Sequence, residues 1–325
     1  MARYILKRII SMIPVLLGVS LLIFILLEMA PGDAAQSILG EFASEESLEA
    51  LREEMGLNDP LLVQYFRFMK DLILKGDLGN SYQTGRPVLD TILERYPMTM
   101  LVALLAVVAT ALLGVATGLL SAVRQYSWID NLATVVGMIG VSAPSFFTGL
   151  LLIFIFSSKL GWLPASGSYG PKYFVLPILT MAIGSCASQM RMTRSAILEV
   201  MRQDYIRTAK AKGQSERVII FHHELRNALT PIITVIGQQA GVLLGGAMIV
   251  EQIFSIPGVG KLMIDSIGTR DYPMVRGGVL FVALSFSVVN LLVDLAYSLV
   301  DPRIRSQFVK SPRKQKMDRE EQKTA

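Results

Sequence analysis

The sequence predicts an all-α integral membrane protein with six transmembrane helices and a small external subdomain after the first helix. Of its 325 residues, 52% are hydrophobic and only 18% are charged, whereas a soluble domain carries about 25% charged residues. The apolar residues also gather into separate runs, and several of these runs approach the length of about 20 residues that a helix needs to cross a bilayer core. This composition excludes a disordered chain, a collagen and a nucleic-acid-binding tail, so we expect no nucleic acid among the partners. The single cysteine, Cys186, excludes a disulfide framework within the chain.

Six apolar runs are the candidate spans, at residues 9–30, 98–123, 132–156, 175–190, 231–250 and 277–300. The first run follows a basic lead and resembles a signal peptide, but it is too long for the apolar region of one, so we expect a first transmembrane helix. The fourth run is short and carries Gly184, Ser185, Ser188 and Gln189. These residues favour a helix that packs against protein instead of lipid.

Basic residues give the predicted orientation. If the chain crosses the membrane six times, one side holds 20 Lys and Arg residues and the other holds 11. Cytoplasmic segments carry the excess of Lys and Arg, so both termini are expected in the cytoplasm. The predicted spans and orientation divide the chain into four parts. These are residues 1–30 with the first helix, an external subdomain at 31–97, a five-helix core at 98–300 and a charged tail at 301–325.

The external segment is acidic and patterned. Residues 31–97 hold twelve Asp and Glu against six Lys and Arg. Helical spacing of apolar residues predicts short helices at 44–55, with Ser44 as the N-cap, and at 61–74. Gly76 and Gly79 predict a tight turn after the second of these helices. The segment is either a compact subdomain alone or a docking surface for an external partner.

The longest internal segment is basic. Residues 191–230 hold eight Lys and Arg against four Asp and Glu, and we call them the basic segment. Apolar residues from Ile197 to Ala209 recur at intervals of three and four, which predicts an amphipathic helix interrupted at Gly213. Helical spacing then resumes until Pro231, which we expect in the first turn of the next span. Two short helices around a glycine would form a rigid knob for a partner, but binding to the lipid surface explains the composition almost as well.

Motifs for catalysis are weak. Residues 255–262 come nearest to a phosphate-binding loop, but serine replaces its first glycine and leucine replaces the hydroxyl that would bind magnesium. The chain's two histidines, His222 and His223, are adjacent and point to different faces of a helix, so they do not predict a metal site. We therefore expect no catalytic residue, no metal and no cofactor on this chain.

Two polar residues lie well inside the last span. Asn290 and Asp294 are four residues apart and share one helical face. They could line a polar translocation path, or they could form hydrogen bonds between helices. The spacings Gly114-x-x-x-Gly118 and Gly241-x-x-x-Gly245 indicate close helix packing.

Several motifs resemble those of a known family. They are Asp204 to Gly213, His223 with Leu225-Arg226-Asn227-Ala228, Pro31-Gly32-Asp33, Gly76 to Ser81, Ile253 to Gly260 and Arg270 to Pro273. Together they resemble type I ABC importer permeases, in particular the DppB/OppB-like branch of the dipeptide/oligopeptide/nickel family. The resemblance extends from the N-terminus to about residue 305. The broad permease signature begins Glu-Ala-Ala, and Arg207, Thr208 and Ala209 stand there instead, which looks normal for the peptide branch.

The resemblance implies a type I permease fold and a transport subunit without its own ATPase site. The basic segment would be the coupling element that sits in a cleft of a cytoplasmic ATPase. The implied coupling residues are Arg207, Thr208, Ala209, Lys210, Ala211, Lys212, Gly213, His223, Leu225, Arg226 and Asn227. The implied partners are a second permease, two ATPase subunits that bind ATP and magnesium, and an external substrate-binding protein, in a bacterial inner membrane.

Other classes of protein stay open from the residues alone. One is a secondary transporter or channel that uses Asp294 as a proton or cation site, although no inverted repeat is evident. Another is a membrane-bound enzyme or assembly factor whose basic segment binds lipid. The resemblance favours import of dipeptides or oligopeptides, but no residue distinguishes these substrates from glutathione or nickel chelates.

Overall fold

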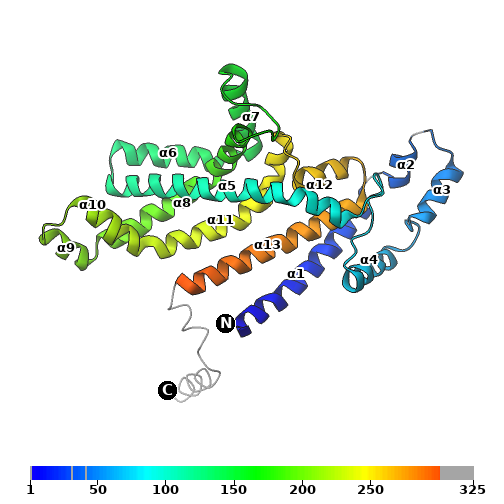
Figure 1. Ribbon diagram of the computed structural model, residues 1–325, viewed down its shortest axis with the longest axis horizontal. Helices are drawn as coiled ribbons and strands as arrows, with labels where there is room; N and C mark the ends of the chain where they lie inside the picture. Colours follow the sequence, from blue (N-terminus) through cyan, green and yellow to red (C-terminus); the bar gives the residue numbers. More distant parts are fainter. Residues whose placement is uncertain (1, 31, 41, 301–325) are drawn as a thin grey trace, which may run out of the picture.

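The computed structural model describes residues 2–30, 32–40 and 42–300, and within these ranges the regular structure is helical. Five helices are long and apolar enough to cross a membrane, which Figure 1 shows as an elongated bundle. They are α1 (Ala2–Glu28), α5 (Val88–Val123), α8 (Lys172–Met201), α11 (Arg226–Ile253) and α13 (Tyr272–Val300). The expected tail at 301–325 lies outside the described residues.

The third expected span, at 132–156, is present as a broken helix. Helix α6 (Trp128–Ser142) is followed by α7 (Ser145–Leu152) and the π-helix η1 (Ile153–Lys159), and the axis bends by 109° between them. Pro144 causes the break, because a proline disfavours helical geometry in the preceding residue. That residue, Ala143, is extended, with ψ of 125°. The pair counts as a sixth span only if it is taken as one bent unit.

Two helix starts also differ from expectation. Helix α5 begins at Val88 and continues through Pro97, so it crosses the expected boundary between the external subdomain and the core. Pro231 lies inside α11 and not in its first turn. A proline within a long membrane helix is tolerated because neighbouring helices satisfy the freed backbone groups.

Helix α8 occupies the centre of the bundle, as its polar composition predicted. Half of its most apolar stretch is buried, against 6% for α13. Gly114 and Gly118 bring α5 onto it, because a Cβ at either glycine would lie 2.6 Å from atoms of α8. The second glycine pair behaves differently: Gly241 packs against α13, whereas nothing lies within 4 Å of a Cβ at Gly245. Close packing is therefore confirmed for three of these four glycines.

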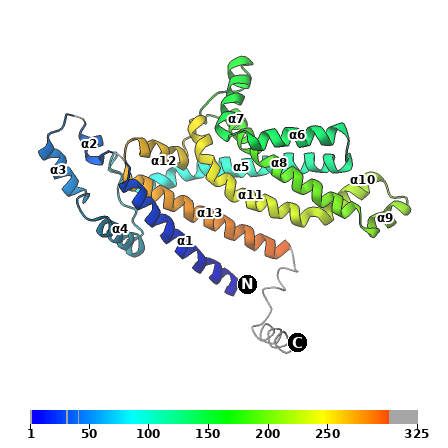
Figure 2. The ribbon, with the colours of Figure 1, turned by 180° about the vertical axis from the view of Figure 1, so that it is seen from behind.

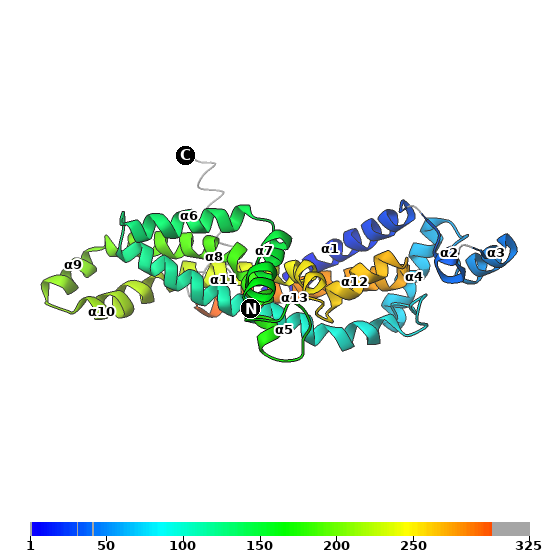
Figure 3. The same ribbon diagram turned by 90° about the horizontal axis from the view of Figure 1, so that it is seen from above.

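The outer subdomain lies at one end of the molecule. It contains α2 (Ala34–Leu39), α3 (Glu45–Glu54) and α4 (Leu61–Lys75), while α12 (Val259–Gly268) lies beside it. The opposite end carries α9 (Asp204–Ala211) and α10 (Glu216–Val218), as Figures 2 and 3 show from two further directions. Ser44 caps α3 as predicted, since its side chain accepts a hydrogen bond from the backbone of Ser47.

Aromatic side chains attach this subdomain to the bundle. Phe24 of α1 contacts Tyr65 and Phe68 of α4, with ring centroids 5.3 Å apart in each pair. The Arg276 guanidinium of α13 lies 4.5 Å from the centroid of the Phe24 ring, a distance at which a cation and a ring attract each other. Helices α1, α4 and α13 therefore meet in one aromatic cluster.

Candidate functional site

Residues 202–225 of the basic segment connect α8 to α11 and contain α9, α10 and a π-helix. The expected helix from Ile197 to Ala209 is in fact two helices, because α8 ends at Met201 and α9 begins at Asp204. Gln203 between them is extended, with ψ of 146°. This break rotates the apolar face, so Tyr205 is exposed and Ile206 is buried in its place. Beyond α9 the chain passes through α10 and the π-helix η2 (Ile219–Leu225) into α11.

A small apolar cluster anchors the unit of α9, α10 and η2. Ile206 and Ala209 of α9 pack on Ile219 of η2, with Val200 of α8 against them. The opposite face of α9 carries the cations. Arg207 keeps 79% of its side chain exposed and lies 3.8 Å from Asp204, while Lys210 and Lys212 are also exposed. The unit therefore fixes its backbone through apolar contacts and leaves its positive charges available.

The turn after α9 depends on Gly213. Its φ is +75°, a conformation that costs other residues steric strain, and nothing lies within 4 Å of the position that a Cβ would take there. The turn is held to η2 by Gln214, whose side-chain oxygen lies 2.7 Å from Nε2 of His223. Asn227 then donates to the carbonyl of His223 at 2.6 Å. The predicted break at Gly213 is confirmed.

The structure brings the eleven expected coupling residues to one end of the bundle. Ala209 is buried, and His223 and Leu225 are half-buried. The other eight are exposed: Arg207, Thr208, Lys210, Ala211, Lys212, Gly213, Arg226 and Asn227. Their exposure gives a largely cationic surface around a buried anchor.

Sequence reasoning missed Glu224, which is only 1% exposed although its neighbours His222 and Phe221 face outward. Its Oε2 atom has no hydrogen-bond partner. Burying an unpaired polar atom costs about 1–3 kcal/mol, so Glu224 is a local weak point beneath the exposed cations. No signal in the sequence separates Glu224 from the three other acidic residues of the basic segment.

The two polar residues of the last span lie against other helices. Asp294 forms an ion pair with Arg8 of α1, at 2.8 Å between Oδ2 and Nη2. The side-chain oxygen of Asn290 lies 3.1 Å from the position of a Cβ at Gly241 in α11. These contacts favour the alternative in which both residues connect helices.

A second polar site lies at the outer end and joins segments far apart in the sequence. Asp271 is 3% exposed and accepts hydrogen bonds from Oγ of Ser81 at 2.5 Å and from the backbone of Tyr82 at 2.9 Å. Burial raises the pKa of the Tyr82 phenol above its usual range. Sequence analysis found the motifs that contain Ser81 and Asp271 but gave no signal that these two residues touch.

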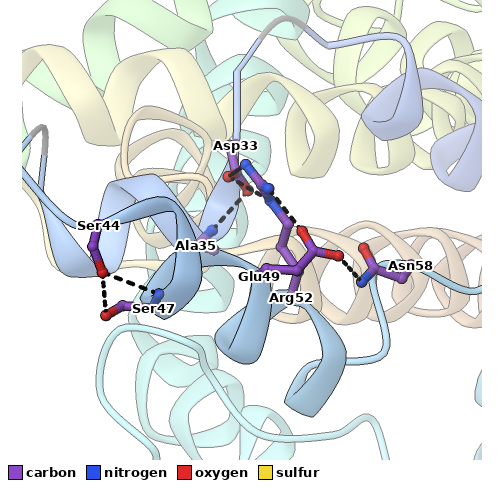
Figure 4. A network of polar contacts seen from close by, with 7 residues as sticks. All are labelled: Asp33, Ala35, Ser44, Ser47, Glu49, Arg52 and Asn58. Carbon is purple, nitrogen blue, oxygen red and sulfur yellow. Dashed lines mark hydrogen bonds and ion pairs between the residues drawn. The ribbon is translucent and has the colours of Figure 1, made fainter.

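The segment after the first span docks at the same place. Asp33 caps α2 through the backbone of Ala35 at 2.9 Å and accepts from Nε and Nη2 of Arg52 at 3.0 and 2.8 Å (Figure 4). A Cβ at Gly32 would overlap the Arg270 guanidinium, so only glycine allows that arginine to lie there. Ser37 also donates to the carbonyl of Thr269 at 2.8 Å. The turn before α13 is therefore the common anchor of the outer subdomain.

A buried carboxylate organises the neighbouring loop. Glu251 is fully buried, and its Oε2 atom accepts from the backbone of Lys261 at 3.1 Å. A Cβ at Gly258 would lie 2.2 Å from this carboxylate, which explains why glycine stands there. The backbone of Val259 donates to Oγ1 of Thr99 at 2.9 Å, which ties the loop to α5. Residues 255–262, which come nearest to a phosphate-binding motif in the sequence, lie in this loop and the first turn of α12. The hydrogen bonds of the loop position the start of that helix instead.

The chain combines helices long and apolar enough to span a membrane, a cationic unit at one end and a subdomain at the other. Comparison with known proteins identifies its class. Residues 114–306 match the binding-protein-dependent transport system inner membrane component family, and residues 1–103 match the N-terminal part of such membrane components. The chain belongs to this family. It is a multi-pass inner membrane protein and a permease subunit, with no ATPase site of its own.

Individual relatives cover nearly the whole chain. The dipeptide transport system permease protein DppB of Alkalihalophilus pseudofirmus is 40% identical over 94% of this chain and all of its own length. The glutathione transport system permease protein GsiC of Escherichia coli K12 is 39% identical over 94% of this chain and 99% of its own.

Solved structures agree on the fold. An amino acid ABC transporter crystallised with histidines has a TM-score of 0.50 at 20% identity and covers 66% of this chain and 94% of its own. The inward-facing MetNI methionine ABC transporter has a TM-score of 0.53 at 17% identity, and the match covers 65% of this chain and 96% of that one. The type I permease fold expected from the sequence is confirmed.

Proposed function

We propose that this chain forms half of the translocation path of an ATP-driven importer of short peptides and that its basic segment docks in a cytoplasmic ATPase subunit. The observation that carries the proposal is the unit of α9, α10 and η2. It is held by Ile206, Ala209 and Ile219 and presents Arg207, Lys210 and Lys212 to the surface. An apolar anchor with exposed charges suits a contact that must transmit movement to the spans.

The remaining partners follow from the same proposal. A second permease would complete the path, two ATPase subunits would bind ATP and magnesium, and an external binding protein would deliver the peptide to the outer subdomain. The basic segment and both termini would then be cytoplasmic, in line with the excess of basic residues on that side. Closure of the ATPase pair would shift the spans between inward and outward states through its different affinity for the two.

Peptide as the substrate class is supported by relatives that carry dipeptide and glutathione, which is itself a short peptide. The alternative of an ATP-independent carrier based on Asp294 has less support, because that carboxylate is paired with Arg8.

Co-purification tests the proposal. The tagged chain is extracted from native membranes in a mild detergent, and the proteins that elute with it are identified by mass spectrometry. We expect a second permease and ATPase subunits. The charge reversal Arg207→Glu with Lys210→Glu should remove the ATPase subunits and leave the second permease.

A matched control places the same change on exposed cations elsewhere in the chain. Lys70 lies in α4 and Lys172 begins α8, and both are exposed. The double variant Lys70→Glu with Lys172→Glu should retain every partner. Loss of the ATPase subunits in both double variants, or in neither, would contradict docking through α9.

A further inference from the structure

A basic cleft lies between α6 and α8, at the end of the bundle that carries α9. It has a volume of about 870 Å³. Arginines form one wall, at positions 191, 194 and 202 of the chain, and apolar side chains from both helices complete it. Neither the coupling residues nor the outer junction contributes to it. The cleft therefore takes its arginines from the basic segment but lies apart from the eleven expected coupling residues.

The back of the cleft is a fixed ion pair. Asp130 of α6 is 3% exposed and accepts from Nε and Nη2 of Arg194 at 2.8 and 2.7 Å. Asp130 also accepts from the side chain of Ser121 and, at 2.9 Å, from the backbone of Tyr126. Two parallel hydrogen bonds hold a guanidinium in one orientation. Arg194 is thus a rigid support whose charge is already compensated.

The remaining charges leave the cleft positive. Within the described part of the chain, neither Arg191 nor Arg202 forms an ion pair, and both are exposed. Glu199 is the one further carboxylate that lines the cleft, so a single negative charge stands against two positive ones. An anionic group that enters the cleft would meet both arginines.

Neighbouring aromatic residues place the cleft at the level of the lipid headgroups. Tyr126 and Trp128 lie at the start of α6 and are 80% and 72% exposed, and such residues concentrate at the boundary between membrane and water. Below them, Val135 and Leu198 line the cleft. Val135 continues into an exposed apolar face of α6 that includes Leu132 and Ile139. Positive charge thus lies above a surface suited to an acyl chain.

We propose that this cleft binds the headgroup phosphate of an anionic phospholipid. Arg191 and Arg202 contact the phosphate, the pair of Asp130 and Arg194 positions the wall between them, and the first part of an acyl chain lies along Val135. Basic pockets between spanning helices on the cytoplasmic side are a recognised form of lipid site. The assignment of this side to the cytoplasm rests on the proposed function. A bound lipid would connect α6 to α8 next to the start of α9.

Native mass spectrometry of the full chain in detergent tests the proposal. The chain is titrated with phosphatidylglycerol or with phosphatidylcholine of the same acyl chains, and bound lipid is counted. We expect phosphatidylglycerol to be retained about thirtyfold better, and Arg191→Gln with Arg202→Gln to remove most of that preference, since each basic residue near an anionic membrane surface contributes about 1 kcal/mol and two of them amount to about thirtyfold. The variant Arg191→Lys with Arg202→Lys should keep most of the preference, which shows that the site is folded.

The matched control is Arg124→Gln with Arg217→Gln, which removes two exposed arginines of the same end that do not line the cleft. It should bind lipid like the native chain. Equal loss in both glutamine variants, or no lipid preference in the native chain, would overturn the proposal. The bound lipid is also challenged with inorganic phosphate at millimolar concentration. If phosphate displaces the lipid completely, the site binds a free anion and the lipid assignment is wrong. Lipid binding is measured without transport, so it stands or fails independently of the proposed function.

Discussion

Asp271 and Ser81 are separated by 190 positions and share a hydrogen bond of 2.5 Å. The bond connects the turn that precedes α5 with the turn that precedes α13. The same carboxylate also accepts from the backbone of Tyr82, while Gln83 donates to the neighbouring carbonyl of Thr269 at 2.9 Å. The outer ends of two spanning helices are therefore held together by side chains from loops.

This relationship predicts the effect of Ser81→Ala. Removing the hydroxyl leaves a buried carboxylate oxygen short of a partner, which should lower the free energy of unfolding by about 1–3 kcal/mol. Thermal unfolding of the purified chain in detergent measures the loss. The control is Gln83→Ala, whose hydrogen bond is exposed, and it should cost less than half as much. Equal costs would mean that the buried carboxylate is not the source of the stability.

The conformation of Gly213 predicts a defect in coupling. Gly213→Val forces a branched side chain into φ of +75°, at a steric cost of about 1–2 kcal/mol, and should displace the turn between α9 and α10. We expect transport per ATP hydrolysed to fall several-fold in vesicles that contain the whole importer. Gly161→Val is the control, because Gly161 has a similar φ of +64° and equally open surroundings in a loop far from α9. A similar fall in both variants would show that strain alone causes it.

Close packing predicts opposite results for two glycines within the spans. A Cβ at Gly118 would lie 2.6 Å from the backbone oxygen of Met190, so Gly118→Ala must push α5 away from α8 and should destabilise the chain by about 1–3 kcal/mol. Gly245→Ala meets open space and should be neutral or slightly stabilising, since alanine favours a helix more than glycine does. Thermal unfolding compares the two variants. An unaffected Gly118→Ala would contradict the contact between these helices.

The ion pair of Arg8 and Asp294 predicts that Asp294→Asn keeps ATP-driven transport. Asparagine keeps a side-chain oxygen that can accept from Arg8, so the contact between α1 and α13 should persist. Uptake of a dipeptide into vesicles with ATP inside checks the prediction. Abolished uptake with an intact complex would return Asp294 to the translocation path.

The all-helical class of the fold and the approximate positions of its helices were predictable, because both depend on local composition. Ser44, followed by apolar residues at helical spacing, predicts α3, and the cap is observed. The basic segment could be identified because eight cations in 40 residues stand out against the apolar spans. The break after Met201 was missed, because helical spacing continues through it and the extended Gln203 carries no proline or glycine signal.

The sequence by itself determined that the chain crosses a membrane, which end carries the cations and where glycines allow tight turns, because hydrophobicity, charge and backbone freedom are properties of single residues and short runs. Only the tertiary structure decided which distant residues meet. It placed Asp271 beside Ser81, Asp294 beside Arg8 and Asp130 beside Arg194. Each of these contacts depends on how two helices or loops are positioned in space, and a carboxylate finds its partner only after the apolar packing of the bundle has fixed that position.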